Sequence, residues 1–151
     1  MAPKYYWEDF TPDWQFESDP RALTLGKITA FAREYDPQSY HVDEEAAKSS
    51  PFGGLIASGW QTCSVAMRLM CDGYLLQSSC IGSPGLDELR WFRPVRPDDA
   101  LRLHSTVIEQ SPSQKEPTRG TVKFRWDVLN QKNEVVCSMT GRQHFLRRTP
   151  K

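Results

Sequence analysis

A run of apolar residues from Trp60 to Met70 constrains most strongly how this chain can fold. The apolar side chains of this run recur on nearly every side of a helix, and Arg68 is its one charged residue. A helix that is apolar almost all round is expected to be buried, and this run is too short to cross a membrane. In a chain of 151 residues, only strands could cover such a helix. The sequence therefore predicts a sheet that wraps around a long central helix.

The second half of the chain supplies candidate strands for this sheet. Leu101, Leu103 and Val107 alternate with polar residues, which is typical of a strand with one buried face. Turn-forming residues separate the candidate strands, which are 86–92, 100–111, 120–129 and 134–146. Helices in the first half followed by hairpin-linked strands predict an α+β class with an antiparallel sheet. We expect a single domain that comprises residues 1–151.

Shorter elements are expected before the central helix. Residues 15–18 and 21–23 are interpreted as a first strand that is broken at Asp19-Pro20. Thr24 is a suitable N-cap for an amphipathic helix that ends near Tyr35.

Three segments are expected outside the regular elements. The aromatic residues of 1–13 predict a segment that lies across the surface or on a partner subunit, since a disordered tail rarely holds so many aromatics. The Ser-, Gly- and Pro-containing stretch from Gly73 to Gly85 predicts a loop that is mobile or acts as a lid. The basic residues of 147–151 predict a solvated end.

Charge and cysteine content exclude several functional classes. The net charge is zero, with 19 basic and 19 acidic residues, so we expect neither a nucleic acid nor an anionic membrane as partner. The N-terminal residues lack the apolar core of a signal peptide, which favours a cytoplasmic protein. The cysteines show neither a Cys-x-x-Cys spacing nor a companion histidine cluster, so free thiols are expected rather than a metal site or disulfides. They are Cys63, Cys71, Cys80 and Cys137.

A carboxylate and an imidazole lie close together in the sequence, on a predicted linker between two helices. Asp36 precedes Pro37, which disfavours helical backbone at Asp36, and His41 precedes Asp43, a suitable N-cap for the next helix. Both side chains are therefore free to converge, and we expect them to approach within about 3 to 5 Å as an acid/base pair. The alternative is that Asp36 caps a turn while His41 packs in the interior or faces water.

The start of the central helix is a second candidate for chemistry. Ser58 and Gln61 fit a capping box, which leaves the amides of Gly59 and Trp60 free at the positive end of the helix dipole. A free amide there could bind a developing oxyanion, and Gly59 has no Cβ to obstruct a ligand. The alternative is simple close packing of the helix start. Ser64 needs a hydrogen-bond partner, which is either its own backbone one turn back or Asp36.

These residues resemble the signature of the MaoC-like dehydratases, the hot-dog family that includes the (R)-specific enoyl-CoA hydratases. The matching residues are Asp36, His41, Val42-Asp43, Ala46-Ala47, Phe52-Gly53-Gly54, Gly59 and Ser64. The segment Trp91–Asp99 resembles a second conserved turn of the family, with Asp98 in place of Gly. The chain departs from the family pattern at Gln38, Ser39 and Ser58, where Asn, Pro and His are usual.

The resemblance implies a hot-dog fold and a hydro-lyase that acts on an enoyl or 3-hydroxyacyl thioester. Asp36 and His41 would activate a water molecule, Gly59 would donate its N–H to the thioester oxygen, and Ser64 would orient Asp36. No metal or bound cofactor is implied, because coenzyme A or an acyl carrier protein enters with the substrate. The candidate substrate-binding residues are Phe52, Gly54, Ile56 and Trp60.

Two other functions remain open at this point. A hot-dog thioesterase would use the same oxyanion chemistry but direct water at the carbonyl carbon. A non-catalytic acyl-binding or dimerisation module would need neither Asp36 nor His41. The resemblance also implies a homodimer, or a dimer of dimers, with its sites near the interface. Arg93 or Arg96 would then be available for a carrier phosphate, or would simply be solvated.

Overall fold

The computed structural model describes residues 1–148. Its short helical turns and helices are η1 (Trp7–Asp9), α1 (Leu25–Tyr35), α2 (Ser39–Val42), α3 (Glu44–Lys48), α4 (Gly59–Gly73) and η2 (Leu75–Gln77). Its strands are β1 (Gln15–Glu17), β2 (Arg21–Ala22), β3 (Cys80–Trp91), β4 (Ala100–Pro112), β5 (Arg119–Leu129) and β6 (Val135–Leu146). The broken first strand and the helix that begins after Thr24 lie where the sequence predicts them.

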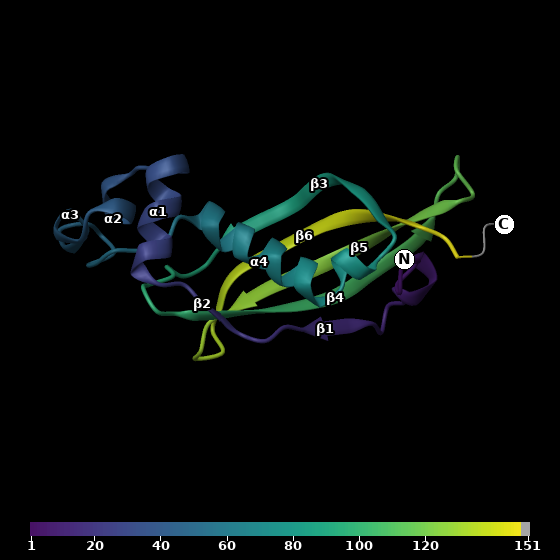
Figure 1. The fold of residues 1–151 in the computed structure, drawn as a ribbon, viewed down its shortest axis with the longest axis horizontal. Helices are drawn as coiled ribbons and strands as arrows, with labels where there is room; N and C mark the ends of the chain where they lie inside the picture. The colour runs from purple at the N-terminus through teal and green to yellow at the C-terminus, as the bar shows by residue number, and fades with distance from the viewer. Residues whose placement is uncertain (149–151) are drawn as a thin grey trace.

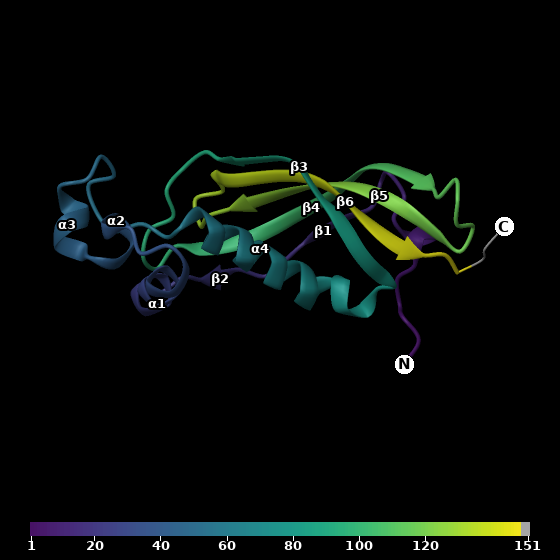
Figure 2. The same ribbon diagram turned by 90° about the horizontal axis from the view of Figure 1, so that it is seen from above.

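The strands form one antiparallel sheet, and α4 lies along one of its faces (Figures 1 and 2). The strand order is β1-β4-β5-β6-β3, and β2 also pairs with β4. Leu101, Leu103 and Val107 of β4 are buried, as their alternation predicts. The arrangement is the predicted α+β hot-dog fold, with a central helix against an antiparallel sheet.

The central helix is buried on one face only, so the prediction of complete burial is wrong. Val65, Ala66 and Leu69 face the sheet and are buried, whereas Trp60 and Met67 on the other side are exposed. One sheet can cover only one side of a helix, and Trp60 and Met67 on the other side stay exposed among residues 1–148.

The N-terminal segment packs against its own sheet. Phe10 is fully buried and contacts the rings of Tyr74, Phe124 and Phe145. Trp7 lies against Gly120, where a Cβ would come within 2.4 Å of the Trp7 ring nitrogen. This segment therefore closes one end of the core.

The C-terminal end of the described chain is held by ion pairs rather than being simply solvated. Arg148 pairs with Asp9 at 2.7 Å, and Arg147 lies 3.9 Å from Glu8. The remainder of the predicted basic tail, 149–151, lies outside the described residues.

The predicted loop from Gly73 to Gly85 is wrong from Cys80 onward, because β3 begins there and pairs with β6. Gly82 and Gly85 adopt φ of 133° and 135°, and the pairing register shifts at both. The turn-forming residues therefore mark bulges in an edge strand.

No helix within residues 1–148 is both long enough and apolar enough to cross a membrane. All four cysteines are free thiols.

Candidate active site

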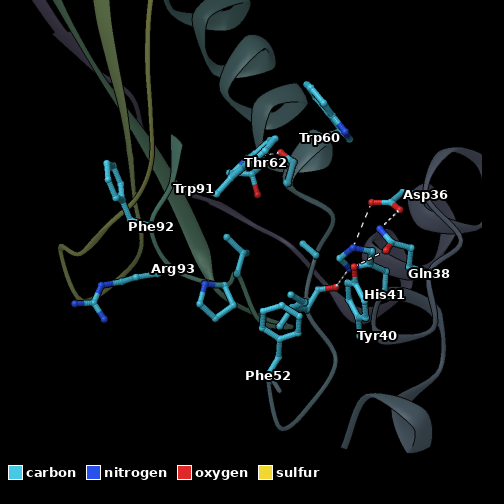
Figure 3. A pocket seen from close by; sticks show the side chains of 15 residues that line it. Asp36, Gln38, Tyr40, His41, Phe52, Trp60, Thr62, Trp91, Phe92 and Arg93 are labelled. Atoms are coloured by element: carbon cyan, nitrogen blue, oxygen red, sulfur yellow. Dashed lines mark hydrogen bonds and ion pairs between the residues drawn. The ribbon is translucent and has the colours of Figure 1, made fainter. Parts of the chain in front are cut away.

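A pocket of about 410 Å³ lies where α2, the N-terminus of α4 and the C-terminal end of β3 meet (Figure 3). Asp36, His41 and Gly59, the residues singled out from the sequence, all line it. The other lining residues are Gln38, Tyr40, Phe52, Ile56, Ala57, Trp60, Thr62, Trp91, Phe92, Arg93, Pro94 and Val95.

Local structure directs Asp36 and His41 toward each other. Asp36 is the C-cap of α1, where Pro37 ends the helix, and its backbone N–H still donates to the Ala32 carbonyl. The chain then turns into the short helix α2, which carries His41 into the interior with an exposed fraction of 4%. His41 Nε2 lies 3.3 Å from Asp36 Oδ2, within the predicted range. The linker between two helices therefore brings the two side chains together.

The hydrogen bond of His41 Nδ1 defines which ring nitrogen is free for chemistry. Nδ1 lies 2.7 Å from the Ile56 carbonyl oxygen. A carbonyl oxygen only accepts, so Nδ1 must carry the proton, and Nε2 of the neutral ring is an acceptor. Nε2 and the Asp36 carboxylate are then two acceptors that face each other. A donor such as water, or a proton on Nε2, satisfies both.

The Asp36 carboxylate is fixed by hydrogen bonds on both oxygens. Oδ2 accepts from the Ser58 hydroxyl at 2.7 Å, and Oδ1 accepts from Gln38 Nε2 at 2.7 Å. The Tyr40 hydroxyl in turn donates to Gln38 Oε1 at 2.5 Å. Burial alone would raise the pKa of Asp36, but the donors Ser58 and Gln38 and the adjacent His41 together hold it below its ordinary value. Asp36 is therefore a carboxylate at neutral pH.

Ser64 does not hold Asp36, contrary to the role that the resemblance implied. Its hydroxyl donates to the Trp60 carbonyl at 2.8 Å, one turn back, and the residue is exposed. Ser64 lies in the second turn of α4. Ser58 instead lies at the N-cap, beside the end of α1, and it makes the bond to Asp36.

Gly59 is the first residue of α4, and its N–H has no hydrogen-bond partner among residues 1–148. The Trp91 ring lies against its Cα, where a Cβ would come within 2.5 Å of the ring. Trp91 Nε1 also donates to the Gly59 carbonyl at 3.0 Å. The sequence predicted free amides at both Gly59 and Trp60. The Gly59 amide is free and lies beside the Trp91 ring, whereas the prediction for Trp60 is wrong because its amide donates to the Ser58 hydroxyl oxygen at 3.3 Å.

The predicted substrate-binding residues divide between the pocket and its surroundings. Phe52, Ile56 and Trp60 line the pocket, but Gly54 does not. Gly53 turns the chain with φ of 69°, and Gly54 then faces the Arg96 guanidinium outside the pocket.

Several functional candidates were not identified from the sequence. Ser58 was recognised only as an N-cap, and Gln38 only as a departure from a pattern. Nothing in the local sequence marks Thr62 or Trp91 as pocket residues.

Comparisons with known proteins concern the family and the fold of this chain. The family model for the MaoC like domain matches residues 9–126. The crystal structure of the MaoC-like dehydratase from Rhodospirillum rubrum superimposes with a TM-score of 0.89 and 41% identity, covering 95% of this chain and 98% of that one.

Two curated relatives extend the comparison. The uncharacterized protein YdeM of Bacillus subtilis is 32% identical over 129 residues, which are 85% of this chain and 90% of that protein. The 3-hydroxyacyl-thioester dehydratase Z of Mycobacterium tuberculosis is 31% identical over 94 residues, which are 61% of this chain and 62% of that protein.

Proposed function

Because this chain belongs to the MaoC-like dehydratase family, we propose that it is a hydro-lyase that adds water to an enoyl thioester or removes water from a 3-hydroxyacyl thioester. The observation that carries this proposal is the 3.3 Å approach of the Asp36 carboxylate to the acceptor nitrogen of His41 at a pocket wall. Two acceptors in this position can bind both hydrogens of one water molecule. Its oxygen lone pair is then left to attack the substrate.

The two groups divide the work according to their hydrogen bonds. Asp36, held as a carboxylate, accepts one hydrogen from the water and fixes its orientation. His41 Nε2 takes the other proton as the water oxygen forms a bond to C3 of the enoyl thioester. The electron pair of the C2–C3 double bond moves toward the thioester oxygen. The proton on Nε2 then passes to C2, which restores neutral His41 and completes the addition of one water.

Charge that develops on the thioester oxygen needs a hydrogen-bond donor. The free N–H of Gly59 at the N-terminus of α4 supplies one, and the helix dipole adds to the stabilisation. The bulk of Trp91 on Gly59 keeps this part of the pocket apolar, which strengthens the interaction.

The carrier of the acyl group would leave the pocket between β3 and the loop that follows it. Arg93 lines the pocket and pairs with Glu134 at 3.1 Å on its exposed side. Arg96 is already bonded to the Phe52 carbonyl at 2.6 Å. We favour Arg93 as the arginine that would exchange its carboxylate partner for a phosphate of coenzyme A or of an acyl carrier protein.

A homodimer is proposed with this function. Among the described strands, β3 pairs only with β6, so its other edge is open. Leu86 and Trp91 on β3, together with Trp60 and Met67 on α4, expose apolar surface beside that edge. Pairing of two identical edges around a twofold axis would cover this surface and place two pockets near the interface.

A screen of enoyl-CoA thioesters for loss of conjugated absorbance tests the proposal. We expect hydration of at least one thioester without release of free coenzyme A. Release of free thiol would indicate a thioesterase instead. Binding without turnover of any thioester would indicate an acyl-binding module.

A further inference from the structure

Thr62 is a buried polar residue of α4 that the proposed mechanism leaves unused. Its exposed fraction is 2%, and it lines the pocket. Its amide donates to the Ser58 carbonyl at 3.2 Å, but its hydroxyl has no hydrogen-bond partner among residues 1–148. A hydroxyl in a helix commonly bonds to the carbonyl one turn back, as Ser64 does. The Thr62 hydroxyl is therefore free for a molecule that enters the pocket.

The position of Thr62 relates it to the free amide at the helix start. Gly59 and Thr62 are three residues apart, so they share one face of α4. Side chains of a helix lean toward its N-terminus, which directs the Thr62 hydroxyl back toward the end where the Gly59 N–H is free. Figure 3 shows Thr62 beside Trp91, on the side of the pocket opposite Asp36 and His41.

Apolar residues line the pocket together with Thr62. Ala57 and Val95, which also line the pocket, are both almost fully buried. A hydroxyl at the wall of such a pocket makes a strong hydrogen bond when a charged acceptor arrives. The acceptor that gains charge in a hydration reaction is the thioester oxygen.

We propose that the Thr62 hydroxyl is a second donor to the thioester oxygen, beside the Gly59 N–H. This inference rests on the proposed function and adds a catalytic residue to it. Both donors come from the first turns of one helix, so their relative position is fixed before the substrate binds. The bond strengthens as negative charge moves to the oxygen, so it acts mainly on the transition state.

The comparison of Thr62→Val with Thr62→Ser tests the role in catalysis. Valine has nearly the same shape but no hydroxyl, whereas serine keeps the hydroxyl. For Thr62→Val we expect kcat to fall about 10²-fold with little change in KM, as for the loss of one oxyanion donor. The loss should be equal for substrates with different acyl groups. Thr62→Ser should retain activity within a few fold. A thermal melt of each variant checks folding.

A binding measurement tests the same contact without catalysis. Calorimetry would compare butyryl-CoA with its thioether analogue, S-butyl-CoA, which lacks the carbonyl oxygen. The wild-type protein should bind the thioester more tightly than the thioether, and Thr62→Val should reduce that preference by roughly 2- to 10-fold, the range expected for one net hydrogen bond.

Unchanged kinetics and an unchanged preference for the thioester in Thr62→Val would overturn the inference. A loss confined to acyl groups with polar substituents would also overturn it, because Thr62 would then contact the acyl chain. If the wild-type protein neither hydrates nor dehydrates any thioester, the proposed function fails, and the thioester preference still decides whether Thr62 contacts the carbonyl.

Discussion

Ser58 joins two parts of the site through one hydroxyl group. Its oxygen accepts a hydrogen bond from the Trp60 amide at 3.3 Å, and the same hydroxyl donates to Asp36 Oδ2 at 2.7 Å. The cap of α4 and the orientation of the carboxylate therefore depend on the same atom.

We expect Ser58→Ala to shift the acidic limb of the pH–rate profile to higher pH. The hydroxyl stabilises the charged form of Asp36, so its removal raises the pKa of Asp36. The working carboxylate is then lost at a higher pH as the solution is acidified. The matched control is Ser64→Ala, because Ser64 lies on the same helix but bonds only to a backbone carbonyl.

The lowered pKa of Asp36 also makes the stability of the fold depend on pH. The pKa of Asp36 in the folded state lies below its ordinary value, so its contribution is present at neutral pH and is lost as the pH falls through the folded-state pKa. Ser58→Ala should weaken this contribution, and acid unfolding followed by circular dichroism would measure it. An acidic limb that is identical in Ser58→Ala and the wild type would argue against the role of this hydrogen bond.

We expect Asp36→Asn and His41→Ala each to lower turnover by roughly 10²-fold or more, because each removes one of the two groups that bind the water. His104→Ala is the control, since His104 lies on β4 and its ring nitrogen bonds to Gln15, and neither residue lines the pocket. Wild-type rates in either pocket variant on the best substrate would reject the acid/base assignment.

Asp36, His41 and Gly59 were predicted from a proline that ends a helix, a short linker and an N-cap, together with their match to the pattern of the MaoC-like dehydratases. The sequence does not predict the partners of Asp36. Ser58 lies 22 positions away, and its contact depends on how α1 and α4 pack. Gln38 is close to Asp36 in sequence, but the sequence does not show which rotamer its side chain adopts or where its amide group points.

At the scale of elements, the end of β3 and the start of α4 form one unit. Trp91 closes over Gly59 and also packs edge-to-face on Trp60, with ring centroids 5.3 Å apart. Residue 59 must therefore be glycine, because a Cβ there would clash with the Trp91 ring.

We expect Gly59→Ala to destabilise the fold by about 1–3 kcal/mol, the usual cost of overpacking, and to lower turnover. The new Cβ would force the Trp91 ring away from the helix start. The control is Gly26→Ala in α1, where a Cβ meets nothing within 4 Å. Chemical denaturation and kinetics of both variants measure the difference. If Gly59→Ala had the same free energy of unfolding as the wild type, the Trp91 ring would move aside for the new Cβ at no cost in stability.

The elements were predictable where one periodicity dominates. Strands β4, β5 and β6 and helix α1 follow clear alternation or a clear apolar stripe. β3 was missed at its start because bulges at Gly82 and Gly85 interrupt the alternation. The burial of α4 was overestimated because the sequence shows which residues are apolar but not whether the cover comes from this chain or another.

At the scale of the whole molecule, α4 and the edge strand β3 meet where Trp60 packs on Trp91, and both elements expose apolar side chains. They expose Met67 and Leu86 as well as the tryptophans at the pocket. An apolar surface of this kind, next to unpaired backbone groups, favours association with a second copy.

We expect the double variant Met67→Lys/Leu86→Lys to be a monomer at concentrations where the wild type sediments as a dimer, because like charges would meet across the twofold axis. The control is Ile108→Lys. Ile108 is equally exposed, but it lies on β4, which β5 and β6 separate from β3. A wild-type protein that sediments as a stable, active monomer at micromolar concentration would exclude the dimer.

The ion pair between Arg148 and Asp9 joins the two terminal segments of the described chain. These segments lie at the end of the molecule opposite α2 and α3 (Figure 1), and α2 carries the pocket residue His41. When chain termini lie close together and far from a site, a short linker can join them. New termini can then be made in another loop without changing the site. The polar turn 113–118, between β4 and β5, is a suitable position for the new termini. The fold should therefore tolerate circular permutation, and either end could be fused to another domain while the pocket stays accessible.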